Sequence, residues 1–337
     1  MSRSFSVAVV GATGLVGEAV LELLNERELP IAALQLVASD ASAGRRVEYK
    51  GGYLKVANIE RFDFAGVDVA LFAVPPAVSA QYSPRAAEHG CVVVDLSGIW
   101  LADPQVPVVL PGINEAALDD VRERNLVAVP AGIAAQVAPL LACLLEDQAP
   151  ERISLTAMLP ASAAGRQGVE ELARQTARLL NSQDPEAEIF PAQSAFATLT
   201  AGIKACGSGT LAPAESARLA LQRLFPVLAG RIQCQVARVP VFFGQSVAFG
   251  WFADRPMGVD QALARFAGAG LGIADLDEVQ RGQALSAGLD SDNVRIHELA
   301  GSDDGTGLSL WVSADNVRYG AALKGVQIVE LLIKDYL

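Results

Sequence analysis

The sequence is poor in the residues that most often carry out chemistry at neutral pH. Its 337 residues include only two histidines, His89 and His297, which we interpret as surface residues in an exposed helix end and a polar loop. There are four cysteines, none in a Cys-x-x-Cys spacing: Cys91, Cys143, Cys206 and Cys234. Because their neighbours are apolar, we expect reduced structural thiols, no metal site and a cytoplasmic protein.

Long apolar runs and positive charge are also scarce. No apolar run reaches the roughly 18 residues of a membrane span, so we expect no membrane segment. The first expected strand begins at Val7, which leaves no room for a signal peptide. A net charge of −12 argues against a nucleic-acid partner, which would require a basic face. An apolar content of 51% predicts a large core, and the length suits two domains.

A β-branched run that leads directly into a glycine-spaced turn stands near the start of the chain. Residues 7–17 read Val-Ala-Val-Val-Gly-Ala-Thr-Gly-Leu-Val-Gly, with Thr13 where a second glycine usually stands. Gly11 permits the tight turn, Gly14 lets the backbone approach a pyrophosphate, and Gly17 lets the following helix lie close to the strand. The amide groups of a helix N-terminus favour an anion. The segment therefore predicts a dinucleotide site.

The first part of the chain alternates short apolar runs with helical segments. The expected strands are Val7–Val10, Ala33–Ala38, Val67–Phe72, Val92–Leu96 and Leu126–Val129. Continuous apolar runs are typical of parallel strands that are buried on both faces. Together with helices expected at Gly17–Glu26 and Ser79–His89, this alternation predicts an α/β fold with a Rossmann-type, doubly wound parallel sheet.

A different set of elements begins at Ile153. The expected strands are Ile153–Met158, Cys234–Val241, Ser246–Phe252 and Leu308–Ser313, and the expected helices are Gly168–Leu180, Ala214–Leu224 and Gly258–Phe266. This pattern predicts an α+β domain with a mixed or antiparallel sheet. The apolar helix Gly320–Ile333 is expected to return to the first domain. We therefore expect residues 1–128 with 316–337 to form one domain and residues 129–315 the other.

Several motifs, in a fixed order, connect this chain to a known family. They are Gly-Ala-Thr-Gly-Leu-Val-Gly at 11–17, Ala-Gly-Arg-Gln-Gly at 164–168, Arg-Val-Pro-Val at 238–241, and Ser-Ala-Asp-Asn-Val-Arg-Tyr-Gly-Ala-Ala-Leu at 313–323. Over nearly its whole length the chain resembles the aspartate-semialdehyde dehydrogenase family of amino-acid biosynthesis. The resemblance implies a cofactor site at Gly11, Thr13, Gly14, Leu15, Val16, Ser39 and Asn316. It also implies substrate contacts, here vestigial, at Arg238 and Glu215, the latter with Arg218.

The residues that carry out the family's chemistry are missing. Family members attack the aldehyde with a cysteine thiolate, transfer hydride to NADP and release the acyl group to phosphate, while a histidine handles protons. The matching nucleophile position here is Gly132, which has no side chain to form a covalent intermediate. The matching base position is Gln245, whose amide does not exchange protons near neutral pH.

Other departures from the family pattern lie in the same site. The glutamine that positions the acyl group is matched by Leu159, and a phosphate-binding arginine by Leu101. A glycine pair beside the nicotinamide is matched by Pro75 and Pro76, which lack amide protons. These replacements predict a site that no longer supports acyl chemistry.

The nucleotide preference follows from the segment after the second strand. Where NADP-dependent members have Ser-x-Arg-Ser-Ala-Gly, this chain reads Ser-Asp-Ala-Ser-Ala-Gly at 39–44. The arginine is absent and Asp40 adds negative charge, which favours NAD over NADP. Arg45 and Arg46 follow and could compensate, although a solvated loop position is the simpler interpretation. We therefore expect a site for NAD or NADP, with NAD favoured, and the alternative is that nucleotide binding has been lost.

The resemblance implies a homodimer formed through the second domain. The residues support this separately, because the expected strands Val236–Val241 and Ser246–Phe252 have apolar side chains on both faces of the sheet. We expect Val239, Val241, Phe243 and Val247 to require a cover, which an equivalent sheet of a second copy would supply.

Three hypotheses follow from these observations. The first is a catalytically degenerate homologue, a pseudoenzyme with no catalytic residues and an unknown small-molecule ligand. The second is an oxidoreductase that transfers hydride without a covalent intermediate, with Ser97, Ser162 or Gln245 as its polar group. The third is a non-enzymatic subunit that pairs with an active paralogue.

Overall fold

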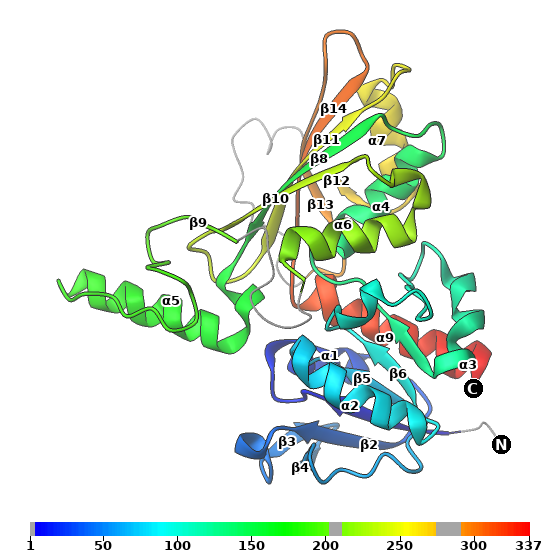
Figure 1. The fold of residues 1–337 in the computed structure, drawn as a ribbon, viewed down its shortest axis with the longest axis vertical. Coiled ribbons are helices and arrows are strands. Elements are labelled where there is room, and N and C mark those ends of the chain that lie inside the picture. The colour runs from blue at the N-terminus through cyan, green and yellow to red at the C-terminus, as the bar shows by residue number, and fades with distance from the viewer. Residues whose placement is uncertain (1–3, 202–210, 274–290) are drawn as a thin grey trace. The chain divides into compact units, whose positions relative to one another are not determined.

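The structure, a computed structural model, describes residues 4–201, 211–273 and 291–337 (Figure 1). Residues 202–210, which include Cys206, lie outside the described residues. The chain divides into two compact units. The first comprises Met1–Ala131, Ala205–Leu211 and Ala321–Leu337, and the second comprises Gly132–Lys204 and Ala212–Gly320.

The first unit contains a seven-stranded sheet in the order β3-β4-β2-β1-β5-β6-β7. Its strands are β1 (Phe5–Val10), β2 (Ile31–Ala38), β3 (Arg46–Tyr49), β4 (Gly52–Asn58), β5 (Val69–Phe72), β6 (Val92–Asp95) and β7 (Leu126–Ala128). All neighbouring strands are parallel except β3 and β4. The predicted Rossmann-type parallel sheet is confirmed, because its central strands are the continuous apolar runs of the sequence.

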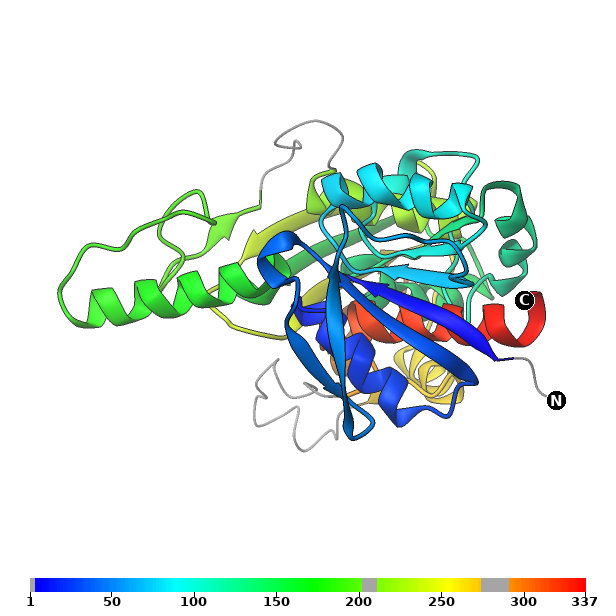
Figure 2. The ribbon, with the colours of Figure 1, turned by 90° about the horizontal axis from the view of Figure 1, so that it is seen from below.

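Helices cover both faces of this first sheet. They are α1 (Leu15–Glu26), α2 (Pro76–Glu88), the short α3 (Val121–Arg124) and α9 (Lys324–Leu331). Figure 2 shows α2 on one face and α1 with α9 on the other. Gly325 permits the close approach of α9, since a Cβ there would lie 3.0 Å from Leu71 Cδ1. The C-terminal helix therefore packs on the first sheet, as the sequence predicted.

The edge hairpin of β3 and β4 was not predicted from the sequence. Its turn, Lys50-Gly51, has positive φ at both residues (48° and 75°), the conformation of a tight hairpin turn. Arg46 and Glu48 are exposed, so the strand lacks the continuous apolar run of its neighbours. Polar residues on an edge strand discourage pairing with another chain.

The second unit contains a mixed seven-stranded sheet in the order β12-β13-β14-β11-β8-β10-β9. Its strands are β8 (Arg152–Leu159), β9 (Leu199–Thr200), β10 (Ile232–Arg238), β11 (Gln245–Phe252), β12 (Gly272–Ile273), β13 (Arg295–Gly301) and β14 (Gly307–Ala314). Its helices are α4 (Ile133–Leu145), α5 (Gly165–Leu180), α6 (Pro213–Leu224) and α7 (Val259–Gly268). In Figure 1, α4, α6 and α7 gather on one side of this sheet.

The central strands of the second sheet alternate cleanly between two faces. Val247, Phe249 and Trp251 are at most 2% exposed and lie on the face that the helices cover. The expectation that Val247 requires a cover from a second copy was therefore wrong, because this alternation turns it toward the subunit's own core. Val241 lies beyond the end of β10 and remains 39% exposed.

Helix α5 projects from the second sheet, and the chain that follows returns beside it (Figure 2). Two buried side chains hold this returning segment. Glu171 accepts hydrogen bonds from the amides of Glu188, Ile189 and Phe190 at 2.6–3.1 Å. Gln175 Oε1 accepts from the amides of Ser194 and Ala195 at 2.7 and 3.1 Å.

Among the described residues, no helix is both long and apolar enough to cross a membrane.

Candidate functional site

The turn between β1 and α1 requires glycine at two of its three glycine positions. Gly11 has φ +90°, and a Cβ on it would lie 2.2 Å from the carbonyl oxygen of Ala73. A Cβ on Gly17 would lie 2.1 Å from the carbonyl oxygen of Gly11. Packing therefore requires both residues to be glycine. A Cβ on Gly14 would meet only Gly11, at 3.4 Å, so packing imposes a much weaker demand there.

Gly14 is the residue before the first turn of α1, which no side chain caps. Leu15 and Val16 open the helix, so its N-terminal amides remain available to an anion. Thr13 Oγ1 donates to Ser42 Oγ at 3.1 Å, and the Ser42 amide donates to the Ser39 carbonyl at 3.0 Å. These bonds bring the glycine turn and the segment after β2 together at the carboxyl edge of the first sheet.

The segment that would meet a nucleotide ribose carries an exposed carboxylate. Asp40 Oδ1 accepts a hydrogen bond from Asn58 Nδ2 at 2.8 Å. Arg45 and Arg46 are exposed, and Arg46 is the first residue of β3 rather than part of the loop.

Positions 132 and 245 face each other within the second unit. Gly132 precedes α4 with φ +57° and ψ −123°, a conformation that glycine adopts readily and other residues do not. Its amide donates to the Gly320 carbonyl at 2.8 Å. A Cβ built on Gly132 would lie 3.6 Å from Gln245 Oε1. A side chain at 132 would therefore touch the side chain at 245.

Gln245 is hydrogen-bonded to a second buried amide side chain, that of Gln136 in the first turn of α4. Gln136 is 1% exposed and Gln245 2%. Gln245 Nε2 donates to Gln136 Oε1 at 2.7 Å, and Gln136 Nε2 donates to the main-chain carbonyl of Gln245 at 3.3 Å. Both side chains are neutral at every pH at which the protein folds, so this pair neither accepts nor releases a proton.

Asn316 also lies in the second unit, after β14. Its Oδ1 accepts from Ser162 Oγ at 3.2 Å and from the Gly244 amide at 3.1 Å. The neighbouring Asp315 accepts hydrogen bonds from the amides of Val317 and Arg318 at 2.7 Å. These bonds fix the segment that begins the C-terminal helical turn.

Arg238, the last residue of β10, has an unsatisfied donor. Its Nη1 is buried and has no hydrogen-bond partner among the residues that the structure describes. Burial lowers the pKa of the guanidinium, whose carbon lies 5.9 Å from the centre of the Phe190 ring. The adjoining cavity of about 10 Å³ is the size of one water. A larger anion could reach Nη1 only if this end of β10 opened.

The second expected substrate contact, Glu215, lies half-buried in the first turn of α6. Arg218, which sequence reasoning joined to it, instead donates to Gln222 Oε1 at 3.2 Å. Leu159 is 6% exposed at the end of β8.

At the carboxyl edge of the first sheet lies a buried carboxylate, Asp95. It accepts hydrogen bonds from Ser79 Oγ and from Ser97 Oγ, the latter at 2.8 Å. Burial raises the pKa of Asp95 to about 6, against the lowering effect of these hydrogen bonds. Nearby, Leu101 is 2% exposed, and Pro75 and Pro76 begin α2 without amide donors.

No described cysteine is activated as a nucleophile. Burial raises the pKa of the Cys91 thiol to about 12 and that of Cys234 to about 11, and it also raises the pKa of Cys143. No group of three or more His, Cys, Asp or Glu side chains in the described ranges could hold a metal ion.

The histidines have different surroundings. His89 is exposed beyond α2, as expected. The interpretation of His297 as a surface residue was wrong, because it lies in β13, is 5% exposed and has Nε2 2.6 Å from Ser313 Oγ. Burial and the nearby Arg295 lower its pKa.

The first unit has a nucleotide-type sheet with a glycine turn, and the second has a mixed sheet. This order of units is that of a class of dehydrogenases, and two family models of that class match the chain. Residues 6–121 match the semialdehyde dehydrogenase NAD binding domain, and residues 141–319 match the semialdehyde dehydrogenase dimerisation domain. The chain belongs to the aspartate-semialdehyde dehydrogenase family.

Whole-length relatives agree with this assignment. Aspartate-semialdehyde dehydrogenase 2 of Vibrio cholerae is 35% identical, and a USG-1 protein homolog of Pseudomonas aeruginosa is 38% identical, each covering 100% of both chains. The solved structure of the Vibrio cholerae aspartate semialdehyde dehydrogenase II complexed with ASA has a TM-score of 0.92 at 34% identity over 100% of both chains. A probable aspartate-semialdehyde dehydrogenase from Pseudomonas aeruginosa has a TM-score of 0.90 at 35% identity, covering 99% of this chain and 100% of that one.

Asp95 gives the first unit a pH-dependent stability. Because burial raises its folded pKa from 3.8 to about 6, the folded state binds this proton more tightly than the unfolded state does. The stabilisation is present below the unfolded pKa and is lost as pH rises through about 6. Relative to Asp95→Asn, the native chain should lose about 3 kcal/mol of unfolding free energy between roughly pH 4 and pH 7.

Urea-induced unfolding at a series of pH values measures this difference. Glu88→Gln, which alters an exposed carboxylate at the end of α2, should leave the pH dependence unchanged. Parallel pH curves for the native chain and Asp95→Asn would contradict the assignment.

Proposed function

We propose that this chain keeps the nucleotide-binding fold of its family but does not carry out semialdehyde dehydrogenation through a covalent intermediate. The observation that carries the proposal is that positions 132 and 245 face each other as a nucleophile and a base would. A Cβ built on Gly132 would lie 3.6 Å from Gln245 Oε1. The family motifs match these positions to the nucleophile and the base. At one position there is no side chain, and at the other there is an amide hydrogen-bonded to Gln136.

The backbone at position 132 supports the same conclusion. A residue with a Cβ at φ +57° and ψ −123° is strained by about 1–3 kcal/mol. A working cysteine at position 132 would therefore require a different backbone conformation before α4, in addition to the thiol itself. Leu101, Leu159 and the proline pair at 75 and 76 further remove the polar groups that would hold phosphate, acyl group and nicotinamide.

Hydride transfer without a covalent intermediate is the second candidate, and Asp95 is the observation in its favour. Among the three candidate polar side chains, Ser162 donates a hydrogen bond to Asn316, and the amide of Gln245 is neither an acid nor a base near neutral pH. Ser97 donates to Asp95, so this pair could pass a proton. Asp95 itself is fully buried, which supports a structural role instead.

We propose that residues 1–128 with 316–337 hold the nucleotide and that residues 129–315 form the vestigial substrate region. The nucleotide contacts proposed in the first unit are Gly11, Thr13, Gly14, Leu15, Val16 and Ser39, and the family motif adds Asn316. The uncapped start of α1 and the space beside Gly14 fit a pyrophosphate. A bound nicotinamide ring would supply hydride chemistry. The buried free thiols of Cys91 and Cys143 are in keeping with a cytoplasmic protein.

The purified chain should not reduce NAD or NADP with aspartate semialdehyde and phosphate above background. Nucleophile and base act as a unit, so losing both leaves no partial activity of the covalent route. The double variant Gly132→Cys with Gln245→His should also show little activity, because strain at 132 and the apolar phosphate and acyl positions remain.

Absorbance of the reduced cofactor measures the rate, and nucleotide titration of the same sample shows that the protein is competent to bind. Steady turnover by the native chain, at the roughly 1–1,000 per second of ordinary enzymes, would refute the proposal. A wider panel of aldehydes and hydroxy acids tests the Ser97–Asp95 alternative, with Ser97→Ala as the diagnostic variant.

Nucleotide binding should favour NAD by about tenfold or more over NADP, because Asp40 repels a 2′-phosphate and no arginine stands at position 41. Asp40→Asn should narrow this preference, whereas Asp63→Asn, in an exposed loop away from the turn, should not. Calorimetric titration with both nucleotides measures it. Tighter binding of NADP by the native chain would assign the phosphate to Arg45 or Arg46.

The chain should form an obligate homodimer through the open face of the second sheet. This face carries small residues, including Thr156, Ala248 and Ser309, beside the partly exposed Trp311. Small residues allow two sheets to approach, and an interface of more than about 2,000 Å² would be expected. In sedimentation at micromolar concentration, Trp311→Arg should weaken the dimer and Tyr53→Arg, on an exposed strand of the first unit, should not. A stable native monomer of 35.2 kDa would overturn the expectation.

A further inference from the structure

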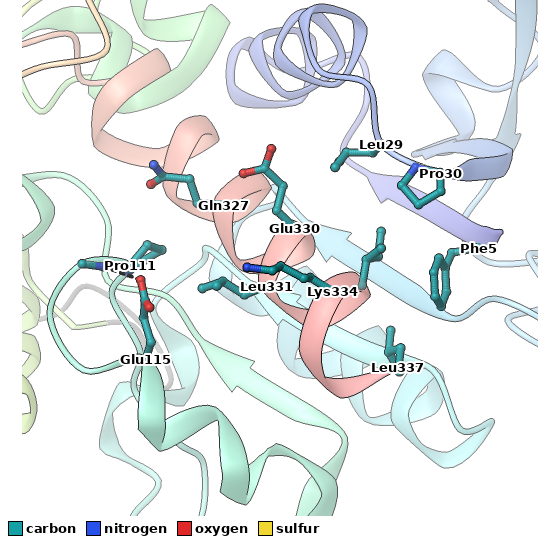
Figure 3. Close-up of a pocket in the computed structure, with 12 residues that line it drawn as sticks. Phe5, Leu29, Pro30, Pro111, Glu115, Gln327, Glu330, Leu331, Lys334 and Leu337 are labelled. Atoms are coloured by element: carbon teal, nitrogen blue, oxygen red, sulfur yellow. Dashed lines mark hydrogen bonds between the residues drawn. The ribbon is translucent and has the colours of Figure 1, made fainter. Parts of the chain in front are cut away.

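A cavity of about 900 Å³ opens in the first unit beside the C-terminal helix (Figure 3). Phe5, Leu29, Pro30 and Leu337 line one side of it. Its size falls within the roughly 300–1,000 Å³ of small-molecule sites. An apolar wall of this extent, left in contact with water, is a common mark of a binding site.

The opposite side of the cavity is polar. Figure 3 shows Glu115 there with Pro111 and Gln327, and the Lys334 ammonium points toward this side. Within the described part of the chain, Lys334 makes no hydrogen bond or ion pair. Glu115 uses Oε1 to accept the Gly112 amide at 2.8 Å and pairs with no cation there. One positive and one negative side chain are thus left without a partner of opposite charge.

The other charged side chain of the lining is already neutralised. Glu330 is ion-paired with Arg27, whose Nη1 lies 2.6 Å from both carboxylate oxygens. Gln327 adds an unmet requirement, because its buried Oε1 accepts no hydrogen bond from the described residues. Gln327 lines the cavity, so a hydrogen-bond donor of a ligand could meet this requirement.

This cavity is separate from the nucleotide site. Phe5 is the first residue of β1, and the glycine turn follows its last residue, Val10. Six residues of strand place the two about 16 Å apart, at opposite edges of the sheet. A ligand in the cavity would therefore leave the turn at Gly11–Gly17 free.

We propose that the cavity binds a small zwitterion with an apolar body, the chemistry of an α-amino acid with a large apolar side chain or of a short apolar peptide. Its carboxylate pairs with Lys334, its ammonium pairs with Glu115 and donates to Gln327, and its apolar body lies against Phe5 and Leu29. A ligand with only one charge would satisfy one side chain and be repelled by the other.

Calorimetric titration of the full-length chain tests this with L-phenylalanine and the dipeptide L-leucyl-L-phenylalanine. N-acetyl-L-phenylalanine, L-phenylalaninamide and glycine lack the ammonium, the carboxylate and the apolar body respectively. We expect at least one of the two zwitterions to bind, and each of the three analogues to bind about tenfold more weakly or worse than L-phenylalanine if it is the ligand. Binding of the dipeptide alone would identify a peptide as the source, with its own acetylated and amidated forms as the weaker analogues.

Two exposed substitutions on the cavity have matched controls elsewhere on the same unit. Lys334→Met and Glu115→Gln should each weaken binding of the zwitterion about tenfold. Lys50→Met and Glu48→Gln, on the exposed edge hairpin, should leave it unchanged. Saturating NAD should also leave it unchanged.

No binding of either zwitterion up to about 10 mM, which corresponds to a free energy weaker than about −3 kcal/mol, would overturn the proposal. Equal binding of the acetylated or amidated forms would overturn it as well, as would equal binding by Lys334→Met and Glu115→Gln. These outcomes are independent of whether the chain catalyses any reaction.

Discussion

A hydrogen bond between two buried amides fixes the centre of the second unit. Gln245, at the start of β11, donates to Gln136 in the first turn of α4, and both side chains are almost wholly buried. Leaving one buried amide without its partner costs about 1–3 kcal/mol, so the two must be retained or replaced together. The pair also holds the start of α4, where Gly132 donates to Gly320. The position that the family motifs assign to the base is therefore occupied by a pair that carries no titratable group.

The parts of the fold that the sequence predicted are those in which burial leaves a continuous pattern. β1, β5 and β6 are covered on both faces, so apart from Ser6 and Asp95 their residues form apolar runs that are readable from the sequence. The β3–β4 hairpin gave no such signal, because an edge strand exposed to water alternates charged and apolar residues. Only its Lys50-Gly51 turn carried information, and that pair is common in ordinary loops.

The site was harder to predict, because it depends on contacts between distant segments. Family motifs could name Gly132 and Gln245, but their 3.6 Å separation follows from how α4 meets β11. His297 was misplaced for a similar reason. Its neighbours Arg295 and Glu298 suggest a loop, yet β14 pairs with this segment and buries the imidazole against Ser313. Val247 was misassigned because an apolar run does not reveal which face its own helices cover.

The returning segment beside α5 is held in an unusual way, and this affects how the protein can change. Glu171 and Gln175 accept hydrogen bonds mainly from main-chain amides of the segment, and the Ser194 hydroxyl is the one side chain among these donors, at 3.0 Å from Gln175 Oε1. Main-chain amides are the same in every residue except proline, so many substitutions from Glu186 to Ala195 would preserve these bonds. The two side chains on α5 must stay, as must the buried Phe190 and Ala195 of the segment, while its exposed positions can change in sequence. This arm is consequently a place where the protein can acquire a new surface without a new fold.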